Sequence, residues 1–471
     1  MSFFGRTFEL SLLDEYYDDG NANLAVVYGR RRVGKSELIL QSLRRCSVPF
    51  IYMECKATSE DENVQRLMEM IPERLGFTPA KCESFEQVLV MLFELFKDRP
   101  MILVLDEYPY LRETKKGFDS VIQSLLDRYK KSSRLKLVIC GSYLEIMRGM
   151  LEYKSPLYGR AGMVIDLKPL DYYDCQGFYD GFSKEDRVRL YAVFGGIPYY
   201  NTLLNPDRTV KENIIKLLVR RDARLEAEVE LFINAEASKI SDANQVIMAM
   251  AAGQRKFSDI LGQTDFKNSS KLADILSKLR SIGLVGKTAP INEPDNPRRT
   301  SWRICDNLTN FYYRYIYRRA SQRLLMNPEE YFRIYISEDF ETKYVPSQFE
   351  GICTEFLIRR NLAGLNDRPF FNIGRYYYDD PVKKKNGEFD IVTEDEAGYV
   401  FYEAKFRAKP LSPQTIQKEL DQVDESPLKP YRCGFISRSE YDGVAASEGL
   451  MLFTLDDLYA PDLSGRLNGE D

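Results

Sequence analysis

The chain has 471 residues, 44% of them hydrophobic and 29% charged, a composition that is ordinary for globular proteins and excludes bulk disorder. Its formal net charge of −5 gives the whole protein no attraction for nucleic acid, so any such attraction must be local. It contains no histidine, which excludes a histidine-containing zinc site and histidine general-base catalysis.

The eight cysteines are scattered and form no CxxC pair, so we expect buried free thiols. No window approaches the roughly 18 apolar residues needed to span a bilayer. The first ten residues carry Arg6 and Glu9 and lack the basic-then-apolar layout of a signal peptide. We therefore expect a cytoplasmic protein with no membrane partner.

Five short apolar runs in the first 168 residues predict the strands of a parallel sheet. They are rich in Val, Ile and Leu and alternate with helical stretches, which is typical of a sheet buried on both faces. The runs are Leu24–Tyr28, Val48–Met53, Met101–Leu105, Leu135–Cys140 and Met163–Leu167.

The first run ends at a turn that fits the P-loop pattern GxxxxGK[ST], and a helix is predicted to follow from Ser36 to Arg44. The turn comprises Gly29, Arg30, Arg31, Arg32, Val33, Gly34, Lys35 and Ser36. Its glycines let backbone N–H groups face phosphates, and the helix N-terminus adds partial positive charge. We expect Lys35 to meet the β- and γ-phosphates of ATP and Ser36 to reach Mg²⁺.

An acidic pair, Asp106 and Glu107, follows the third run. A carboxylate at the end of a buried strand can hold Mg²⁺ beside a P-loop, and the next one can orient the attacking water. We assign these roles to Asp106 and Glu107 respectively, against the alternative of a simple acidic cap on a strand.

The remaining chain divides by composition into four segments after a core of residues 1–168. Residues 169–240 are helical and predict a lid, and residues 241–305 predict a winged helix-turn-helix. Residues 306–345 are aromatic and helical and predict a connector. Residues 346–471 predict a helix, Phe349–Asn361, followed by strands and a further helix.

The predicted winged helix has three helices and a hairpin. The helices are Val246–Ala252, one that starts near Phe257 with a serine cap at Ser258, and a recognition helix, Asn268–Ile282, that stops at Gly283. Strands Leu284–Val285 and Ser301–Ile304 flank the wing, and Trp302 is expected in the core.

This segment is locally basic, with ten basic and five acidic residues, a net of +5. Such an excess suits phosphate contacts, so we expect DNA to be bound there. The residues assigned to this role are Lys267, Lys271, Lys278, Arg298 and Arg299. The alternative stays open that the segment contacts protein or serves as a rigid spacer.

The C-terminal segment places acidic residues and a lysine on predicted strands. Glu403 and Lys405 are two residues apart on one strand and so share a face, and Asp390 lies on the strand before. Two carboxylates can bind Mg²⁺ while a lysine orients or polarises water. Glu350, on the preceding helix, can complete the cluster. Coincidental charge alternation on a half-exposed strand is the alternative.

Four further motifs give the first 345 residues a resemblance to the archaeal-type ATPase family of the AAA+/STAND group. The motifs are Phe4-Gly5-Arg6 with Glu9-Leu10, the strand Leu137 to Ser142, Leu157-Tyr158-Gly159-Arg160, and Gly195-Gly196-Ile197-Pro198-Tyr199-Tyr200. The resemblance implies that Gly5, Arg6 and Pro198 lie near the adenine base. It also implies that Ser142 is a sensor and Arg160 an arginine finger.

Arg160 follows the sensor segment and precedes the fifth strand, which we expect to place it near the nucleotide edge of the sheet or at a boundary between subunits. Residues 346–471 resemble the PD-(D/E)xK nuclease superfamily, which implies a site of Glu350, Asp390, Glu403 and Lys405. Gln414 and Gln417 lie where that superfamily often has a further polar residue.

The expected fold class is α/β: a P-loop AAA+ core with parallel sheet and helical lid, a winged helix-turn-helix, and a restriction-endonuclease-like C-terminal domain. The expected function is an ATP-hydrolysing switch that acts on or near DNA, with ATP and Mg²⁺ as cofactors. The expected function includes magnesium-dependent cleavage of DNA by the C-terminal domain. A homo-oligomer in which Arg160 acts between subunits fits this function. The alternative is a STAND-type signalling or scaffold ATPase whose C-terminal parts only bind partners.

Overall fold

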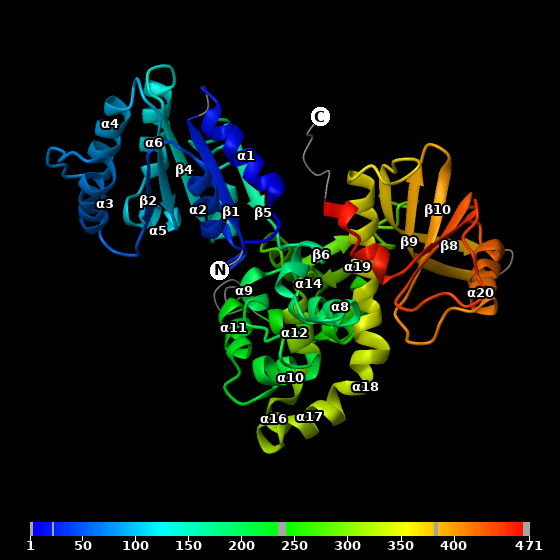
Figure 1. Ribbon diagram of the computed structural model, residues 1–471. Helices are drawn as coiled ribbons and strands as arrows, with labels where there is room; N and C mark the ends of the chain where they lie inside the picture. The colour runs from blue at the N-terminus through cyan, green and yellow to red at the C-terminus, as the bar shows by residue number, and fades with distance from the viewer. Residues whose placement is uncertain (1–2, 21–22, 234–241, 381–384, 465–471) are drawn as a thin grey trace. The chain divides into compact units, whose positions relative to one another are not determined.

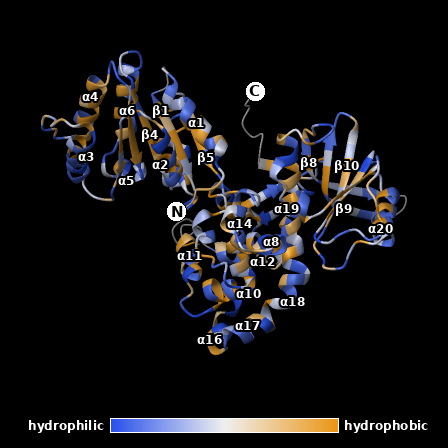
Figure 2. Cartoon of the chain, in the orientation of Figure 1, coloured by the Kyte–Doolittle hydropathy of each residue, from blue (hydrophilic) through white to orange (hydrophobic). Residues whose placement is uncertain are grey.

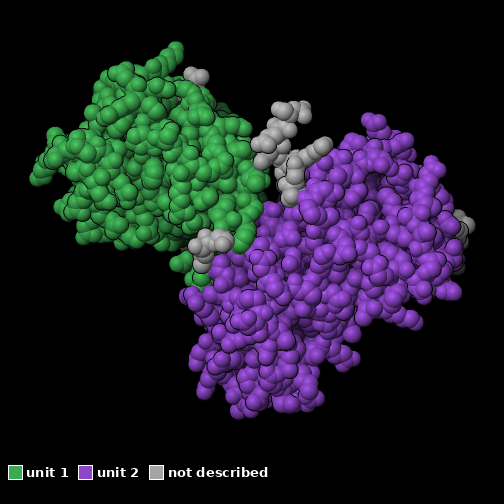
Figure 3. All heavy atoms as spheres, in the orientation of Figure 1, with its two compact units in different colours: residues 1–169, 197–199 green, residues 170–196, 200–471 purple. Residues whose placement is uncertain are grey.

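A computed structural model describes residues 3–20, 23–233, 242–380 and 385–464. The chain divides into two compact units (Figure 3), residues 1–169 with 197–199 and residues 170–196 with 200–471. The predicted boundary between lid and winged helix, at residues 240 and 241, lies outside the described residues. Within those residues, no helix has both the length and the apolar character that crossing a membrane would require.

The first unit is built on a five-stranded sheet with the order β2-β3-β4-β1-β5, in which every neighbouring pair is parallel. The strands are β1 (Leu24–Gly29), β2 (Phe50–Glu54), β3 (Met101–Asp106), β4 (Leu135–Gly141) and β5 (Met163–Leu167). Every residue of β1, β3 and β4 is buried. The continuous apolar runs of the sequence therefore form the centre of this sheet, which is largely orange in Figure 2.

Helices surround this sheet (Figure 1). They are α1 (Thr7–Asp18), α2 (Lys35–Arg45), α3 (Glu60–Leu75), α4 (Phe85–Leu95), α5 (Tyr108–Thr114), α6 (Phe118–Tyr129) and α7 (Leu144–Gly149). Ser59 and Ser84 cap α3 and α4 by accepting hydrogen bonds from main-chain N–H groups three residues on. Because all five strands are parallel, the loops after β1, β3 and β4 meet at one edge of the sheet.

The second unit begins with helices and continues through an aromatic, helical connector. The first group is η1 (Asp174–Phe178), α8 (Lys184–Phe194), α9 (Pro198–Asn201, shared with the first unit), α10 (Val210–Ile214), η2 (Ile215–Val219) and α11 (Arg224–Phe232). The connector holds α15 (Asn307–Phe311), η4 (Tyr312–Ile316), η5 (Tyr317–Arg319), α16 (Ala320–Leu325), α17 (Pro328–Tyr335), α18 (Ser337–Asp339) and η6 (Phe340–Tyr344). Phe311, Tyr315 and Tyr344 form a buried aromatic cluster that fixes the connector.

Three helices and a hairpin lie between these two groups. They are α12 (Ala243–Ala251), α13 (Phe257–Gly262), α14 (Ser269–Ser281), and the antiparallel strands β6 (Val285–Thr288) and β7 (Ser301–Ile304). Gly283 has a φ of 72°, the left-handed conformation expected where α14 stops. The predicted serine cap is wrong, because α13 already begins at Phe257 and the Ser258 hydroxyl donates to Asp259.

The C-terminal part is a mixed sheet with the order β12-β11-β10-β9-β8. Its elements are α19 (Val345–Leu362), β8 (Asn372–Asp380), β9 (Lys385–Asp395), β10 (Gly398–Lys405), α20 (Pro413–Glu425), β11 (Arg432–Ser437), β12 (Leu450–Phe453), α21 (Leu455–Leu458) and η7 (Pro461–Ser464). Strands β8, β9 and β10 form an antiparallel meander, and β10, β11 and β12 are parallel. The structure thus confirms the expected α/β fold class, with a parallel core sheet and a separate C-terminal sheet.

Candidate functional site

The P-loop connects β1 to α2 and wraps around the Lys35 ammonium group. Lys35 Nζ donates to the carbonyl oxygens of Gly29 and Arg30, at 3.0 and 3.1 Å. A side chain at Gly29 would come within 2.5 Å of the Leu167 carbonyl oxygen, and Gly34 has a φ of 97°, so both positions favour glycine. Arg30, Arg31, Arg32 and Val33 form the turn between them. The loop therefore holds a cation at the N-terminus of a helix, which is a binding site for phosphates.

The end of β3 supplies the oxygen ligands beside this loop. Ser36 Oγ donates to Asp106 Oδ2 at 2.7 Å, and the Tyr52 hydroxyl donates to the same oxygen. Burial and the adjacent Asp106 raise the pKa of Tyr52, so its hydroxyl remains a donor at neutral pH. A hydroxyl and a carboxylate at hydrogen-bond distance fit the oxygen donor set of Mg²⁺. Ser36 and Asp106 are the residues that would hold it.

Glu107 stands next to this pair in a strained conformation. Its φ of 50° and ψ of 42° are left-handed, which a residue with a side chain rarely adopts. Ser142, directly after β4, donates its hydroxyl to both Glu107 carboxylate oxygens, at 3.1 and 3.0 Å. Strain held by neighbouring contacts is typical of functional positions. The structure thus brings the proposed catalytic carboxylate and the proposed sensor into direct contact.

Residues of the opening motif and Pro198 also reach the P-loop. Arg6 is buried, and its guanidinium donates to the carbonyl oxygens of Val33 and Lys168 at 3.3 and 2.6 Å. Gly5 precedes it, also with a positive φ. A side chain at Gly34 would meet the ring of Pro198 at 3.7 Å, so Pro198 also borders the loop. These contacts place the residues expected near the base next to the phosphate loop.

Arg160 lies elsewhere, and the expectation that it sits near the nucleotide edge is wrong. It precedes β5, whose first residue Met163 pairs with Ala25 at the start of β1. The P-loop follows the end of β1, so Arg160, near the start of β1, lies at the opposite edge of the parallel sheet. There the Arg160 guanidinium pairs with both carboxylate oxygens of Asp127, at 3.0 and 2.8 Å, and lowers the pKa of that carboxyl. The parallel sheet predicted from the sequence already implied this position, because a residue that precedes a parallel strand lies at the edge opposite the loops that follow the strands.

The C-terminal acidic residues and lysine come together on adjacent strands. Tyr402 of β10 pairs with Ile391 of β9 in antiparallel register, so the next positions, Glu403 and Asp390, are opposite each other and share a face. Lys405 Nζ lies 2.5 Å from a Glu403 carboxylate oxygen. Asp390 is exposed to solvent, whereas Glu403 and Lys405 are half-buried.

Glu350 of α19 belongs to the same electrostatic cluster. Desolvation and the Asp390 carboxylate raise the pKa of Glu350 to about 8, so this carboxyl is protonated at neutral pH. Desolvation also raises the pKa of Glu403, which the Lys405 ammonium opposes. The side chains of Glu350, Asp390, Glu403 and Lys405 are therefore close enough to influence one another electrostatically.

The donor chemistry of this cluster fits Mg²⁺ only through Asp390 and Glu403. Mg²⁺ usually takes one or two carboxylates and keeps several waters, and two opposed carboxylates meet that need. Across the described ranges no group of three or more aspartate, glutamate, cysteine or histidine side chains is arranged to hold a metal ion. Glu350 is thus placed beside the pair rather than as a third ligand.

The lysines predicted for DNA binding lie on the exposed side of the three-helix segment. Lys267, Lys271 and Lys278 are all exposed. Lys271 forms an ion pair with Asp242, and Lys278 pairs with Asp274 at 2.8 Å on the same helix. Exposed ion pairs contribute about 0–1 kcal/mol, so phosphates can displace these carboxylates.

The two wing arginines have different environments. Arg298 is exposed. Arg299 stacks on the Tyr377 ring of β8, with 3.7 Å from guanidinium carbon to ring centroid, and lies 3.5 Å from an Asp379 carboxylate oxygen. Arg299 therefore fastens the wing to the C-terminal sheet, and its contact with DNA stays a prediction.

Comparisons with known proteins agree with this geometry. A family model described as an ATPase domain predominantly from Archaea matches residues 3–204, the part that holds the P-loop, the acidic pair and Ser142. This part of the chain is therefore an archaeal-type ATPase domain. A second model, described as archaeal and bacterial proteins of unknown function, matches residues 312–419.

Relatives of this archaeal-type ATPase cover most of its length. An uncharacterized protein of Methanocaldococcus jannaschii is 28% identical over 410 residues, which is 86% of this chain and 88% of the relative. The solved structure of a Walker-type ATPase of Pyrococcus abyssi shares the fold, with a TM-score of 0.51 and 21% identity over 66% of this chain and 96% of that one. The protein is a P-loop ATPase.

Sequence reasoning missed Glu419, which lies beside Lys405 in the C-terminal cluster. Glu419 of α20 lies 2.9 Å from Lys405 Nζ, whereas Gln417 is exposed and donates to Asp421. The available signal was helical periodicity, because Glu419 falls three residues after the buried Ile416 and four before the buried Val423. A carboxylate on the buried stripe of a helix needs a cation, and Lys405 is that cation.

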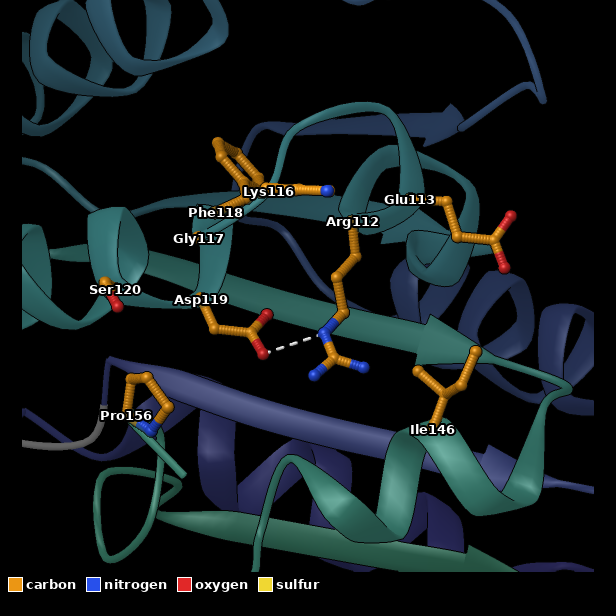
Figure 4. Close-up of a pocket in the computed structure, with 9 residues that line it drawn as sticks. All are labelled: Arg112, Glu113, Lys116, Gly117, Phe118, Asp119, Ser120, Ile146 and Pro156. Carbon is orange, nitrogen blue, oxygen red and sulfur yellow. Dashed lines mark hydrogen bonds and ion pairs between the residues drawn. The ribbon is translucent and has the colours of Figure 1, made fainter. Parts of the chain in front are cut away.

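A cleft of about 360 Å³ in the ATPase core lies apart from the P-loop residues. It is lined by Arg112, Glu113, Lys116, Gly117, Phe118, Asp119, Ser120, Ile146 and Pro156 (Figure 4). Asp119 accepts hydrogen bonds from Arg112 Nε at 2.9 Å and from the Tyr108 hydroxyl at 2.7 Å. These hydrogen bonds join Tyr108 and Arg112 of α5 to Asp119 of α6. Because the three polar groups bind one another, we assign no ligand to this cleft.

Proposed function

We propose that this P-loop ATPase is an ATP-driven switch that acts on DNA and cleaves it at the C-terminal cluster. In the ATPase site, Lys35 and the P-loop N–H groups would hold the phosphates, and Ser36 and Asp106 would hold Mg²⁺, which would supply positive charge to offset that of the phosphates. Glu107, positioned by Ser142, orients the water that attacks the γ-phosphate. Arg160, on the opposite edge of the sheet, can act only on a nucleotide bound by a second copy of the chain.

The convergence of Asp390, Glu403 and Lys405 is the observation that carries the nuclease proposal. Mg²⁺ held by the two carboxylates would lower the pKa of a bound water. The Lys405 ammonium lies beside Glu403 and can stabilise the charge that develops on the phosphate. The exposure of Asp390 leaves room for a backbone phosphate to approach. Because the chain has no histidine, a metal-activated water is the most economical nucleophile for this cleavage.

DNA would reach this part of the protein through the basic residues of the winged-helix segment, residues 243–304. Lys267 and Arg298 are exposed, and the ion pairs of Lys271 and Lys278 are exchangeable. One observation favours the second candidate function, a signalling or scaffold ATPase. The docking of Arg299 on Tyr377 uses part of the wing for an internal contact, as expected of a rigid spacer.

Incubation of supercoiled plasmid with the full-length protein and Mg²⁺ separates these two functions. We expect nicking by the parent protein that is lost in Asp390→Asn and Glu403→Gln. Glu396→Gln is the matched control, because Glu396 is an exposed carboxylate in the turn between the same two strands. Absence of cleavage of any nucleic acid by the parent protein would favour the scaffold function.

A further inference from the structure

An arginine from the winged-helix segment reaches the carboxylate cluster of the C-terminal sheet. Arg255 lies between α12 and α13, and its guanidinium Nη2 donates to Ser347 Oγ at 3.0 Å. Ser347 and Glu350 are three residues apart in α19, so their side chains lie on one face of that helix. Arg255 is therefore next to Glu350 although nearly a hundred residues separate them in the sequence.

The main chain of Arg255 is fixed from the other side. Its carbonyl oxygen accepts a hydrogen bond from the Trp302 N–H of β7 at 2.7 Å, and Trp302 is buried. The side chain itself is exposed. Burial raises the pKa of Glu350 and of Asp390, and the nearby Arg255 charge opposes the rise in both. A solvent-accessible cation is thus held at the rim of the cluster by a rigid support.

Contacts of the wing hold the winged-helix segment and the C-terminal sheet together. Asn292 exchanges two hydrogen bonds with the main chain of Tyr377, at 2.7 and 3.1 Å. The Ile291 N–H donates to the Arg375 carbonyl oxygen at 2.7 Å. Arg375 itself donates to both carboxylate oxygens of Glu388, at 2.9 Å, and so has its charge matched. Strand β8 is the edge strand of its sheet, and these contacts cover part of that edge.

Arg255 differs from the other two cations near the cluster. Arg375 is matched by Glu388, and Lys405 is matched by Glu403 and Glu419. Arg255 makes no ion pair within 4 Å among the described residues, and Ser347 engages one of its N–H groups. A guanidinium has five N–H donors in a planar fork that matches two oxygens of a phosphate. Of these three cations, Arg255 therefore has N–H donors available to bind a substrate.

We propose that Arg255 binds the phosphate of the scissile phosphodiester, so that the cleavage site is shared by the winged-helix segment and the C-terminal domain. This inference rests on the proposed nuclease function. The substrate would be a nucleic-acid backbone that lies along the winged-helix segment and passes between Arg255 and the Asp390–Glu403 pair. Water would attack phosphorus, the P–O bond to the leaving sugar oxygen would break, and that oxygen would take up a proton.

The test uses full-length protein, Mn²⁺ and the chromogenic diester bis(4-nitrophenyl) phosphate, which needs no DNA sequence. For Arg255→Ala we expect kcat/KM to fall about 10²-fold, as when one positioned donor to a transition-state oxygen is removed. Arg255→Lys should recover part of this loss, because it restores a charge without the planar fork. Arg318→Ala is the matched control, since Arg318 is an exposed arginine of the connector.

Mn²⁺ binding, measured by calorimetry on the same proteins, distinguishes the possible failures. Arg255→Ala should bind Mn²⁺ as well as the parent protein or more tightly, because it loses a cation that repels the metal. Equal diester hydrolysis by Arg255→Ala and the parent would overturn the role of Arg255 alone. Faster hydrolysis would show that Arg255 shields the carboxylates instead. A parent protein that binds no Mn²⁺ and hydrolyses no diester would overturn the nuclease function, and this inference with it.

Discussion

Ser142 holds the Glu107 carboxylate through its hydroxyl, at 3.0 and 3.1 Å, and through its main-chain N–H, at 3.4 Å. Glu107 is the residue after β3 and Ser142 the residue after β4, so two adjacent strands deliver them to one edge of the sheet. The contact positions a carboxylate beside Ser36 and Asp106, the residues proposed to hold Mg²⁺.

Ser142→Ala should slow ATP hydrolysis about 10-fold to 10²-fold without weakening ATP binding, because it frees a carboxylate that must be oriented toward water. Glu107→Gln should slow hydrolysis more strongly and also keep ATP binding. Steady-state turnover and binding of a fluorescent ATP analogue measure the two effects. Lys35→Ala is the control that should lose both, since it removes the cation of the phosphate loop. Parent-level turnover in Ser142→Ala would show that the contact is only structural.

Arg160→Ala should reduce ATP turnover about 10³-fold or more if Arg160 completes the site of a second copy, because it removes charge stabilisation of the transferred phosphoryl group. Asp127→Asn, which weakens the internal ion pair of Arg160, should keep the parent rate. Turnover should rise with protein concentration, and mixing Arg160→Ala with Glu107→Gln should give a non-additive rate. Concentration-independent turnover at the parent rate in Arg160→Ala would reduce Arg160 to a surface ion pair.

The neighbouring wing arginines should respond differently to replacement by alanine. Arg299→Ala removes the stack on Tyr377, so we expect a loss of about 1 kcal/mol in the free energy of unfolding and an unchanged salt dependence of DNA binding. Arg298→Ala should leave stability unchanged and lower the slope of log affinity against log salt by about 0.9. Thermal melts and fluorescence anisotropy measure the two quantities. The opposite pattern would mean that Arg299 leaves Tyr377 to contact DNA.

A buried carboxyl should make stability depend on pH. Desolvation raises the pKa of Glu355 to about 7, and Glu355 accepts hydrogen bonds from the Tyr172 N–H and the Tyr191 hydroxyl. The ordinary value is about 4.3, so between these values the folded state binds more protons and the free energy of unfolding falls as pH rises. Glu355→Gln cannot ionise, so its thermal midpoint should fall less than the parent's between pH 5 and pH 8.

Measurements of the midpoint at pH 3 serve as the internal reference for this variant, because Glu355 is then almost fully protonated in both states of the parent protein. The difference in slope between the two proteins should not exceed about 1.4 kcal/mol per pH unit, the effect of one proton. Parallel curves for the two proteins from pH 5 to pH 8 would show that Glu355 ionises as it does in water.

Local patterns predicted most of the fold because they are fixed by short-range chemistry. The buried strands of the core were continuous apolar runs, and Gly29, Gly34 and Lys35 had the spacing that a phosphate loop requires. The same logic located Glu403 and Lys405 on one face of β10, since alternate residues of a strand point the same way.

The sequence did not predict the contacts between side chains of elements that are far apart in the chain. The ion pair of Arg160 with Asp127 depends on where α6 lies, and the role of Glu419 depends on α20 packing over Lys405. The contacts of Arg255 and Arg299 arise only when the winged-helix segment docks on the C-terminal sheet. Of these, only Glu419 has a periodic signal, because the contacts of the three arginines are set by tertiary packing alone.

Cleavage of supercoiled plasmid by the full-length protein with Mg²⁺ and ATP, with ATP hydrolysis measured in the same samples, tests the central claim most directly. The parent protein should cleave. Lys405→Ala should lose at least about 10²-fold in cleavage, because it removes the cation beside Glu403, and should keep its ATP turnover. Cleavage by Lys405→Ala at the parent rate, or no cleavage by the parent protein, would contradict the account of a switch that cuts DNA.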